Sequence, residues 1–122
     1  MTTYLLYHAP WQLLMIAIFV QSSISYIKLP DIGIDWLDKI LHFLCYGILG
    51  LLMARSFLIS KYKKYQNKYW QWSIIFCSLY GLSDEIHQRF IPGRLASFSD
   101  WLADTLGVVI FILIYKWYKS RH

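Results

Sequence analysis

An uncharged apolar stretch near the start of the chain sets the strongest limit on its fold. Residues 10–27 contain no Asp, Glu, Lys or Arg, and most of their side chains are apolar. A bilayer core of roughly 30 Å needs about 20 such residues in a helix. A helix that is apolar on every side lies either in a membrane or deep inside a large protein. With 122 residues, the chain is too short to bury several such helices, so we predict a membrane protein.

Three further stretches have the same character, and the sequence therefore predicts an all-α bundle of four transmembrane helices in a single domain. The predicted spans cover residues 10–27, 37–59, 69–90 and 99–118. Pro30 and Gly33 indicate a loop after the first span, and Pro92 breaks the chain after the third. The apolar content of 57% exceeds the roughly 45–50% of soluble domains. The first span lacks a preceding basic residue and a following small-residue cleavage site, so we expect a retained helix.

The distribution of charge predicts the orientation of these spans. The loop after the second span, the C-terminal tail and Arg55 together hold eight basic and no acidic residues. The opposite side holds four basic residues and all seven acidic ones. Because Lys and Arg collect on the cytoplasmic side, both termini are expected in the cytoplasm. The net charge of +5 is thus explained by the inner leaflet, and we expect no nucleic-acid partner.

Polar side chains form a stripe at the outward end of three predicted helices. Three- and four-residue spacing places side chains on one helical face. The stripes are Asp38, His42 and Cys45 or Tyr46; Gly81, Asp84 or Glu85, and Gln88; and Asp100, Asp104 and Gly107 or Val108. Glu85 lies five residues before Phe90, about 8 Å inside the predicted helix end. Acidic residues at such depth are costly and usually face a cavity or a partner, so we expect the stripes to converge.

Two segments carry a resemblance to a known family. They are DKILHFLCYGILGLL (38–52) and YGLSDEIHQRFIPGRLASFSDWLADTLG (80–107), and the Ser22–Ser23 pair also fits. The chain resembles the VanZ-like family of small membrane proteins. The positions that match the family pattern are Lys39, His42, Tyr46, Asp84, Glu85, Gln88, Pro92, Gly93, Arg94, Asp100 and Gly107. The chain departs from the pattern at Asp104, where the family usually has Asn, so a titratable group stands in place of an amide.

The resemblance implies a bacterial cytoplasmic-membrane protein with a link to susceptibility to teicoplanin, a lipid-tailed glycopeptide. Combined with the polar stripes, it suggests an outward-facing site for the head of an anionic lipid or lipid-linked cell-envelope molecule. Arg94, with Lys39, would hold a phosphate or carboxylate, since Arg suits bidentate recognition of both. The candidate catalytic residues are His42, Asp84, Glu85 and Asp100, and the candidate binding residues are Lys39, Tyr46, Gln88, Arg94 and Asp104.

Three roles for these residues stay open from the sequence. His42 with Glu85 or Asp84 could catalyse acid–base chemistry on a phosphoester or acyl group. The site could instead bind lipid without chemistry, or the polar groups could only hold the helices together. The nucleophile candidates Ser83, Ser97 and Ser99 sit in no known nucleophile motif.

The sequence indicates neither a cofactor nor a metal site. Cys45 and Cys77 lie in apolar stretches without metal-ligand spacing, and we expect both to be buried small hydrophobic residues. The partner expected from the resemblance is a membrane lipid or lipid-linked envelope precursor. A homo-oligomer is compatible with the sequence, which does not fix the oligomeric state.

Overall fold

The computed structural model of the protein describes residues 1–23, 35–92 and 98–122, and for residues 35–38 it describes the backbone alone. The described residues form helices and no strand. The helices are α1 (Thr2–Tyr7), α2 (Ala9–Ser23), α3 (Asp35–Leu58), α4 (Lys63–Asn67), α5 (Tyr69–Gln88) and α6 (Phe98–Arg121). The all-α prediction is therefore confirmed for this part of the chain.

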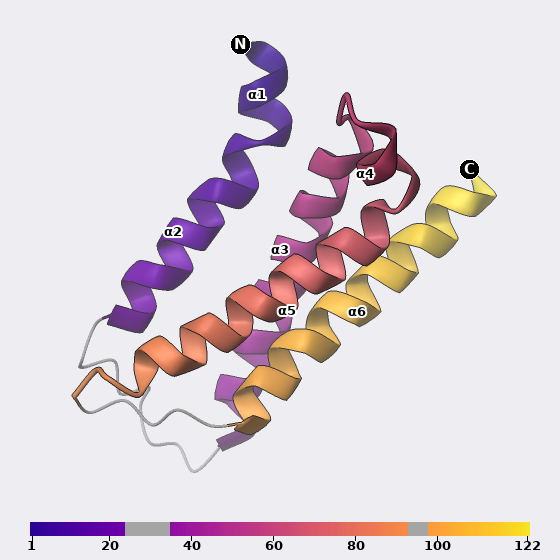
Figure 1. Ribbon diagram of the computed structural model, residues 1–122. Coiled ribbons are helices and arrows are strands. Elements are labelled where there is room, and N and C mark those ends of the chain that lie inside the picture. The colour runs from indigo at the N-terminus through magenta and orange to yellow at the C-terminus, as the bar shows by residue number, and fades with distance from the viewer. Residues whose placement is uncertain (24–34, 93–97) are drawn as a thin grey trace.

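Helix α3 is the centre of the bundle (Figure 1). It packs most extensively against α6 and also contacts α5, while α5 and α6 pack side by side. Helix α2 contacts both α3 and α5. The N-terminus, α4 and the C-terminus lie at one end of the molecule. The C-terminal ends of α2 and α5 and the N-terminal ends of α3 and α6 lie at the other, which we call the acidic end because it carries Asp84, Glu85, Asp100 and Asp104.

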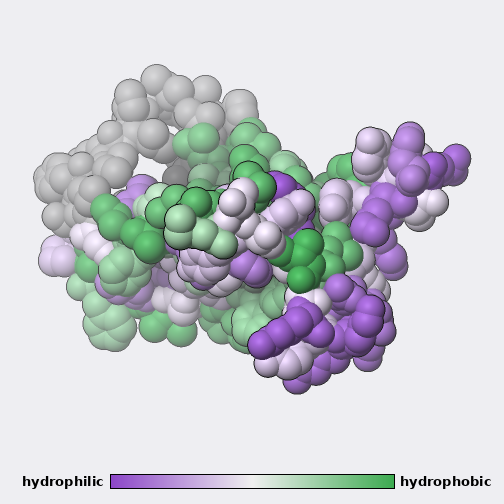
Figure 2. All heavy atoms as spheres, turned by 90° about the horizontal axis from the view of Figure 1, so that it is seen from above, coloured by the Kyte–Doolittle hydropathy of each residue, from purple (hydrophilic) through white to green (hydrophobic). Residues whose placement is uncertain are grey.

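The apolar side chains are distributed as expected for helices surrounded by lipid. A small apolar core, with Leu49, Cys77 and Val108 fully buried, lies between the helices. Large apolar residues are also exposed on the outer faces of the helices, including Leu13, Leu79 and Leu106. Figure 2 views the end that carries α4 and the C-terminus, where patches of hydrophilic residues stand beside hydrophobic surface. The distribution is compatible with helix flanks that lie in a membrane.

Two helical segments, Lys39–Leu58 and Phe98–Arg121, are long and apolar enough to cross a membrane, and Ala9–Ser23 is a shorter apolar helix. The predicted spans 37–59 and 99–118 agree with α3 and α6 to within three residues at each end. The predicted span 69–90 coincides closely with α5, whose polar residues lower its overall hydropathy. The end of the predicted first span lies outside the described residues. The sequence did not predict the short helices α1 and α4, and α3 begins two residues before the predicted span.

A glycine allows α3 and α6 to approach each other closely. A Cβ atom at Gly107 of α6 would lie 2.1 Å from the carbonyl oxygen of Phe43 in α3. Such a distance is far shorter than any real carbon–oxygen contact, so no side chain fits there without separating the helices. Gly107 lies one turn from Asp104, and Phe43 follows His42 directly. The close approach therefore sets the distance across which these two polar residues meet.

Candidate functional site

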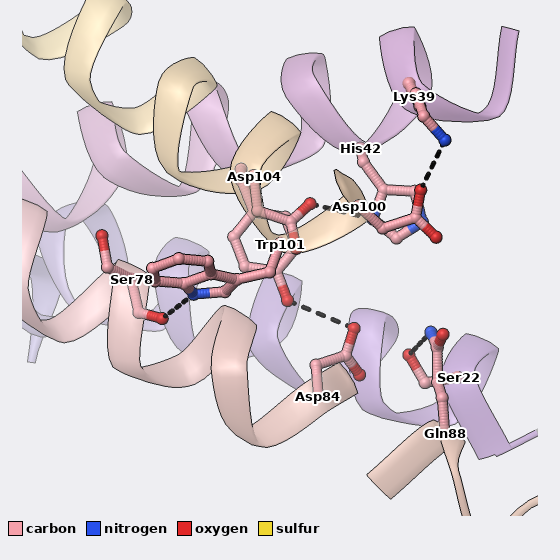
Figure 3. Close-up of polar contacts among 10 residues, drawn as sticks. Ser22, Lys39, His42, Ser78, Asp84, Gln88, Asp100, Trp101 and Asp104 are labelled. Carbon is pink, nitrogen blue, oxygen red and sulfur yellow. Dashed lines mark hydrogen bonds and ion pairs between the residues drawn. The ribbon is translucent and has the colours of Figure 1, made fainter. Parts of the chain in front are cut away.

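Helices α3, α5 and α6 bring buried polar side chains together at the acidic end of the bundle (Figure 3). Lys39, His42 and Tyr46 come from α3 at the spacing that keeps them on one helical face. Helix α5 supplies Asp84, Glu85 and Gln88, and α6 supplies Asp100 and Asp104. Each of these five residues is at most 6% exposed. The predicted convergence of the three stripes is thus seen in the described residues.

The centre of the cluster is a pair between His42 and Asp104. His42 Nδ1 lies 2.8 Å from Asp104 Oδ1, and the side chains are 14% and 0% exposed. The second carboxylate oxygen of Asp104, Oδ2, is buried and has no hydrogen-bond partner among the described residues. Glu85 completes the group, because one donor atom from each of the three residues lies within 4.8 Å of the others. A histidine and two carboxylates thus meet in a space closed to solvent on most sides.

Lys39 marks the rim of the cluster. Its Nζ donates to Asp100 Oδ1 over 3.2 Å. The Lys39 side chain is 44% exposed, whereas that of Asp100 is 9% exposed. The ammonium group can therefore reach a molecule outside the bundle while its partner stays between the helices.

Two further hydrogen bonds extend the cluster toward α2. The Tyr46 hydroxyl donates to Asp84 Oδ2 over 3.3 Å, and the tyrosine is 1% exposed. Gln88 Nε2 donates to the Ser22 hydroxyl oxygen over 3.3 Å, and Ser22 is fully buried. Both bonds are longer than the usual hydrogen-bond distance for such groups.

Part of the predicted site lies outside the described residues. Arg94, the predicted anion-binding residue, is in the segment 93–97, together with Gly93 and the nucleophile candidate Ser97. The side chain of Asp38 is also outside them. The other predicted site residues, Lys39, His42, Tyr46, Asp84, Glu85, Gln88, Asp100 and Asp104, all lie in the cluster or at its rim.

The structure adds polar contacts that the sequence did not predict. His87 Nε2 lies 2.9 Å from the Ser23 hydroxyl, and the His87 ring stacks on Phe19 at 4.9 Å between centroids. His87 follows Asp84 by three residues, and that spacing could have drawn attention to it. Trp101 Nε1 donates to the Ser78 carbonyl oxygen over 2.9 Å, a contact for which the sequence carries no signal.

Two other predictions are affected by the structure. Cys77 is buried, but Cys45 is exposed, so the prediction that both are buried is wrong for Cys45. Cys45 precedes the buried Tyr46 and turns away from the core because only one of the two positions faces α5 and α6. Ser83 is exposed and donates to the Tyr80 carbonyl oxygen over 2.7 Å, which does not prepare it for nucleophilic attack.

The chemistry open to this arrangement follows from its groups. His42 can take up or release a proton, and Asp104 holds its ring through Nδ1, as carboxylates do for catalytic histidines. Lys39 at the rim can attract an anion. A charged cluster of this kind among apolar helices is a functional-site hypothesis by default.

Comparison with known proteins gives one match. A family model described as VanZ/LLP1 matches residues 3–119. No curated protein and no solved structure matches the chain.

Proposed function

Since the chain belongs to the VanZ/LLP1 family, we propose that its cluster at the acidic end binds the polar head of an anionic lipid or lipid-linked cell-envelope molecule. The main support for this proposal is the buried His42–Asp104 pair, which lies close to Glu85. The partly exposed side chain of Lys39 lies at the rim of the same cluster. A head group at the membrane surface would meet Lys39 first. Its lipid tail would lie along the apolar flanks of the helices, where large side chains such as Leu106 are exposed.

Two cationic side chains are proposed to bind the anionic part of the head group. We propose that Lys39 and Arg94 hold the phosphate or carboxylate of the head. Arg94 follows Pro92 and Gly93 after α5, close in sequence to Glu85. Its guanidinium can form two parallel hydrogen bonds with an anion, which a lysine cannot. Gln88 and Tyr46 supply neutral hydrogen-bonding groups beside the carboxylates.

The His42–Asp104 pair favours acid–base chemistry as a second role of the same site. A general base needs a histidine within reach of the substrate and a group that orients its ring. Asp104 Oδ1 binds Nδ1 and orients the ring, and the imidazole would exchange a proton with a bound head group. The substrate in this role is a phosphoester or an acyl ester of the bound lipid.

The alternative function is structural, with the polar cluster serving only to hold the helices together. The Lys39–Asp100 pair fits that role, because it joins α3 to α6. The exposure of Lys39 argues for binding, since a pair at a solvent-exposed rim adds little stability. The two functions differ in what they predict when the cluster is neutralised but the fold is kept.

The proposed function includes a topology: four spans in the bacterial cytoplasmic membrane, both termini in the cytoplasm and the site facing outward. Its support is the eight-to-zero excess of basic residues on one side. Both ends of the chain and α4 also lie at the same end of the bundle. We expect a reporter fused after His122, and one inserted at Lys64, to read as cytoplasmic. An extracytoplasmic signal at either position would place the cluster on the wrong side for an envelope ligand.

Lipid mass spectrometry of the purified protein tests the binding proposal. We expect an anionic lipid or lipid-linked molecule to co-purify with the wild type. Arg94→Ala should reduce its amount at least about tenfold, which corresponds to losing one charge-assisted interaction of about 1.4 kcal/mol or more. Arg94→Lys should also bind less lipid, because lysine keeps the positive charge but cannot form the two parallel hydrogen bonds of the guanidinium.

Arg89→Ala is the matched control, because Arg89 is an exposed cation at the same end of α5. It should leave lipid retention unchanged. If Arg89→Ala and Arg94→Ala lost the same amount of lipid, the effect would come from the overall positive charge at this end and not from a specific contact with Arg94. The same variants can be compared for teicoplanin susceptibility in cells, where we propose that only the Arg94 variants differ from the wild type.

A further inference from the structure

Three metal-ligating side chains converge inside the cluster from three different helices. His42 comes from α3, Glu85 from α5 and Asp104 from α6. One donor atom from each lies within 4.8 Å of the other two. Glu85 is 5% and Asp104 0% exposed, so the group is not a set of solvated surface carboxylates.

A second observation points to a ligand in the same place. Within the part of the chain that the structure describes, Asp104 Oδ2 is buried without a hydrogen-bond partner, while Oδ1 of the same carboxylate is bound by His42. A buried carboxylate oxygen without a partner costs free energy, and such an atom in a native structure calls for an unseen partner. Gly81 leaves space beside it, because a Cβ there would lie 3.3 Å from Oδ2.

The charge of the cluster also favours a cation. Four carboxylates, those of Asp84, Glu85, Asp100 and Asp104, are buried within this part of the described structure. An anionic head group would be repelled by them as they stand. A divalent cation among them would balance part of the negative charge and turn the same cluster into a place where a phosphate can bind.

We propose that His42, Glu85 and Asp104 form a binding site for a divalent metal ion of the zinc class. One imidazole and two carboxylates are a mixed nitrogen–oxygen donor set that suits Zn²⁺ and its first-row neighbours, whereas Mg²⁺ prefers oxygen alone. Neighbouring ligands of a tetrahedral zinc ion lie roughly 3.4 Å apart, given metal–ligand bonds of about 2.1 Å. The side chains therefore close on the ion by up to about 1.4 Å, a movement that rotations about their χ angles can supply.

Three protein ligands leave a fourth position open, as in catalytic zinc sites. The ion would bind an oxygen of the head group there and polarise it, or lower the pKa of a bound water, which would then act as the base in place of the metal-bound His42. This role of the ion rests on the proposed function. The metal site itself does not, so zinc binding and lipid binding can be measured and refuted separately.

Equilibrium dialysis of the metal-free protein in detergent against Zn²⁺, with the bound metal quantified by elemental mass spectrometry, tests the site. We expect one zinc ion per chain at micromolar free Zn²⁺ and little Mg²⁺ under the same conditions. His42→Gln and Glu85→Gln should each weaken zinc binding at least tenfold. His87→Gln is the matched control, because His87 lies one turn from Asp84 but binds Ser23 instead.

X-ray absorption of the zinc-loaded wild type keeps the test independent of how the variants fold. We expect one imidazole in an otherwise oxygen-ligated first shell. Less than 0.2 zinc per chain at about 100 µM free Zn²⁺ would overturn the proposal. Stoichiometric zinc retained by His42→Gln, or a shell with sulfur or several imidazoles, would overturn it as well. Zinc binding without lipid retention would leave the metal site standing and remove the proposed function.

Discussion

Replacing His42 by Leu is expected to lower the free energy of unfolding by about 3–5 kcal/mol, because it leaves the fully buried Asp104 carboxylate without its partner. In detergent this should appear as a fall of the unfolding midpoint on the order of 10 °C. The double variant His42→Leu with Asp104→Asn removes the buried charge as well. It should be more stable than His42→Leu alone, although it lacks more of the native pair.

The matched control for this cycle is Asp104→Asn alone. Asn keeps the shape of Asp and an oxygen that can accept from His42, so we expect an unfolding midpoint within a few degrees of the wild type. If His42→Leu and the double variant were equally stable, the carboxylate would carry no buried charge. The pair would then be an ordinary neutral hydrogen bond of about 1 kcal/mol.

Gly107→Ala is expected to cost about 3 kcal/mol of stability, toward the upper end for overpacking, because the added methyl meets a backbone oxygen that cannot rotate away. The helices α3 and α6 must separate to admit it, and the His42–Asp104 distance of 2.8 Å must grow with them. We therefore expect both a lower unfolding midpoint and reduced lipid retention. The control for stability is Leu106→Ala, at a neighbouring position that is 54% exposed, which should leave the unfolding midpoint nearly unchanged. An unchanged midpoint for Gly107→Ala would show that the helices are not held this closely.

The long helices α3, α5 and α6 were predictable from the sequence, because each contains a long apolar stretch. Long apolar runs within α3 and α6 identify both helices, and the predicted ends lie within three residues of the observed ones. Helices α1 and α4 have 6 and 5 residues, which is too short for an apolar periodicity to be recognised. Their presence depends on contacts with neighbouring helices that a pattern along the chain does not contain.

Spacing in the sequence predicted which described residues lie together at the acidic end, but it did not predict which of them pair. Spacing along α3 places Lys39, His42 and Tyr46 on one face. The rotation and depth of α6 against α3 then decide that His42 meets Asp104 and that Lys39 meets Asp100. That register is set by the packing at Gly107. There the backbone of α3 occupies the place that a side chain on α6 would need. The sequence likewise could not show that Cys45 faces outward, because residues 45 and 46 are both compatible with the polar stripe.

The resemblance to the family predicts an Asn at the position where this chain has Asp104. An Asn at this position would bind His42 as a neutral amide. The Asp in this chain adds a buried charge, and its second oxygen is the atom without a hydrogen-bond partner. We expect Asp104→Asn to weaken zinc binding, because the amide removes one negative charge from the site. Comparing zinc binding by the wild type and Asp104→Asn in the dialysis experiment bears on this point directly.

The central claim is that the cluster binds the head of a lipid and does not serve only to join helices. Native mass spectrometry of the protein released from bacterial membranes measures this most directly. We predict that the wild type carries one anionic lipid or lipid-linked molecule per chain. The variant His42→Gln with Asp104→Asn, in which two amides replace the pair, should keep its unfolding midpoint and lose that molecule. A wild type released without any bound lipid, or an amide variant that retains the lipid at wild-type occupancy, would contradict the claim.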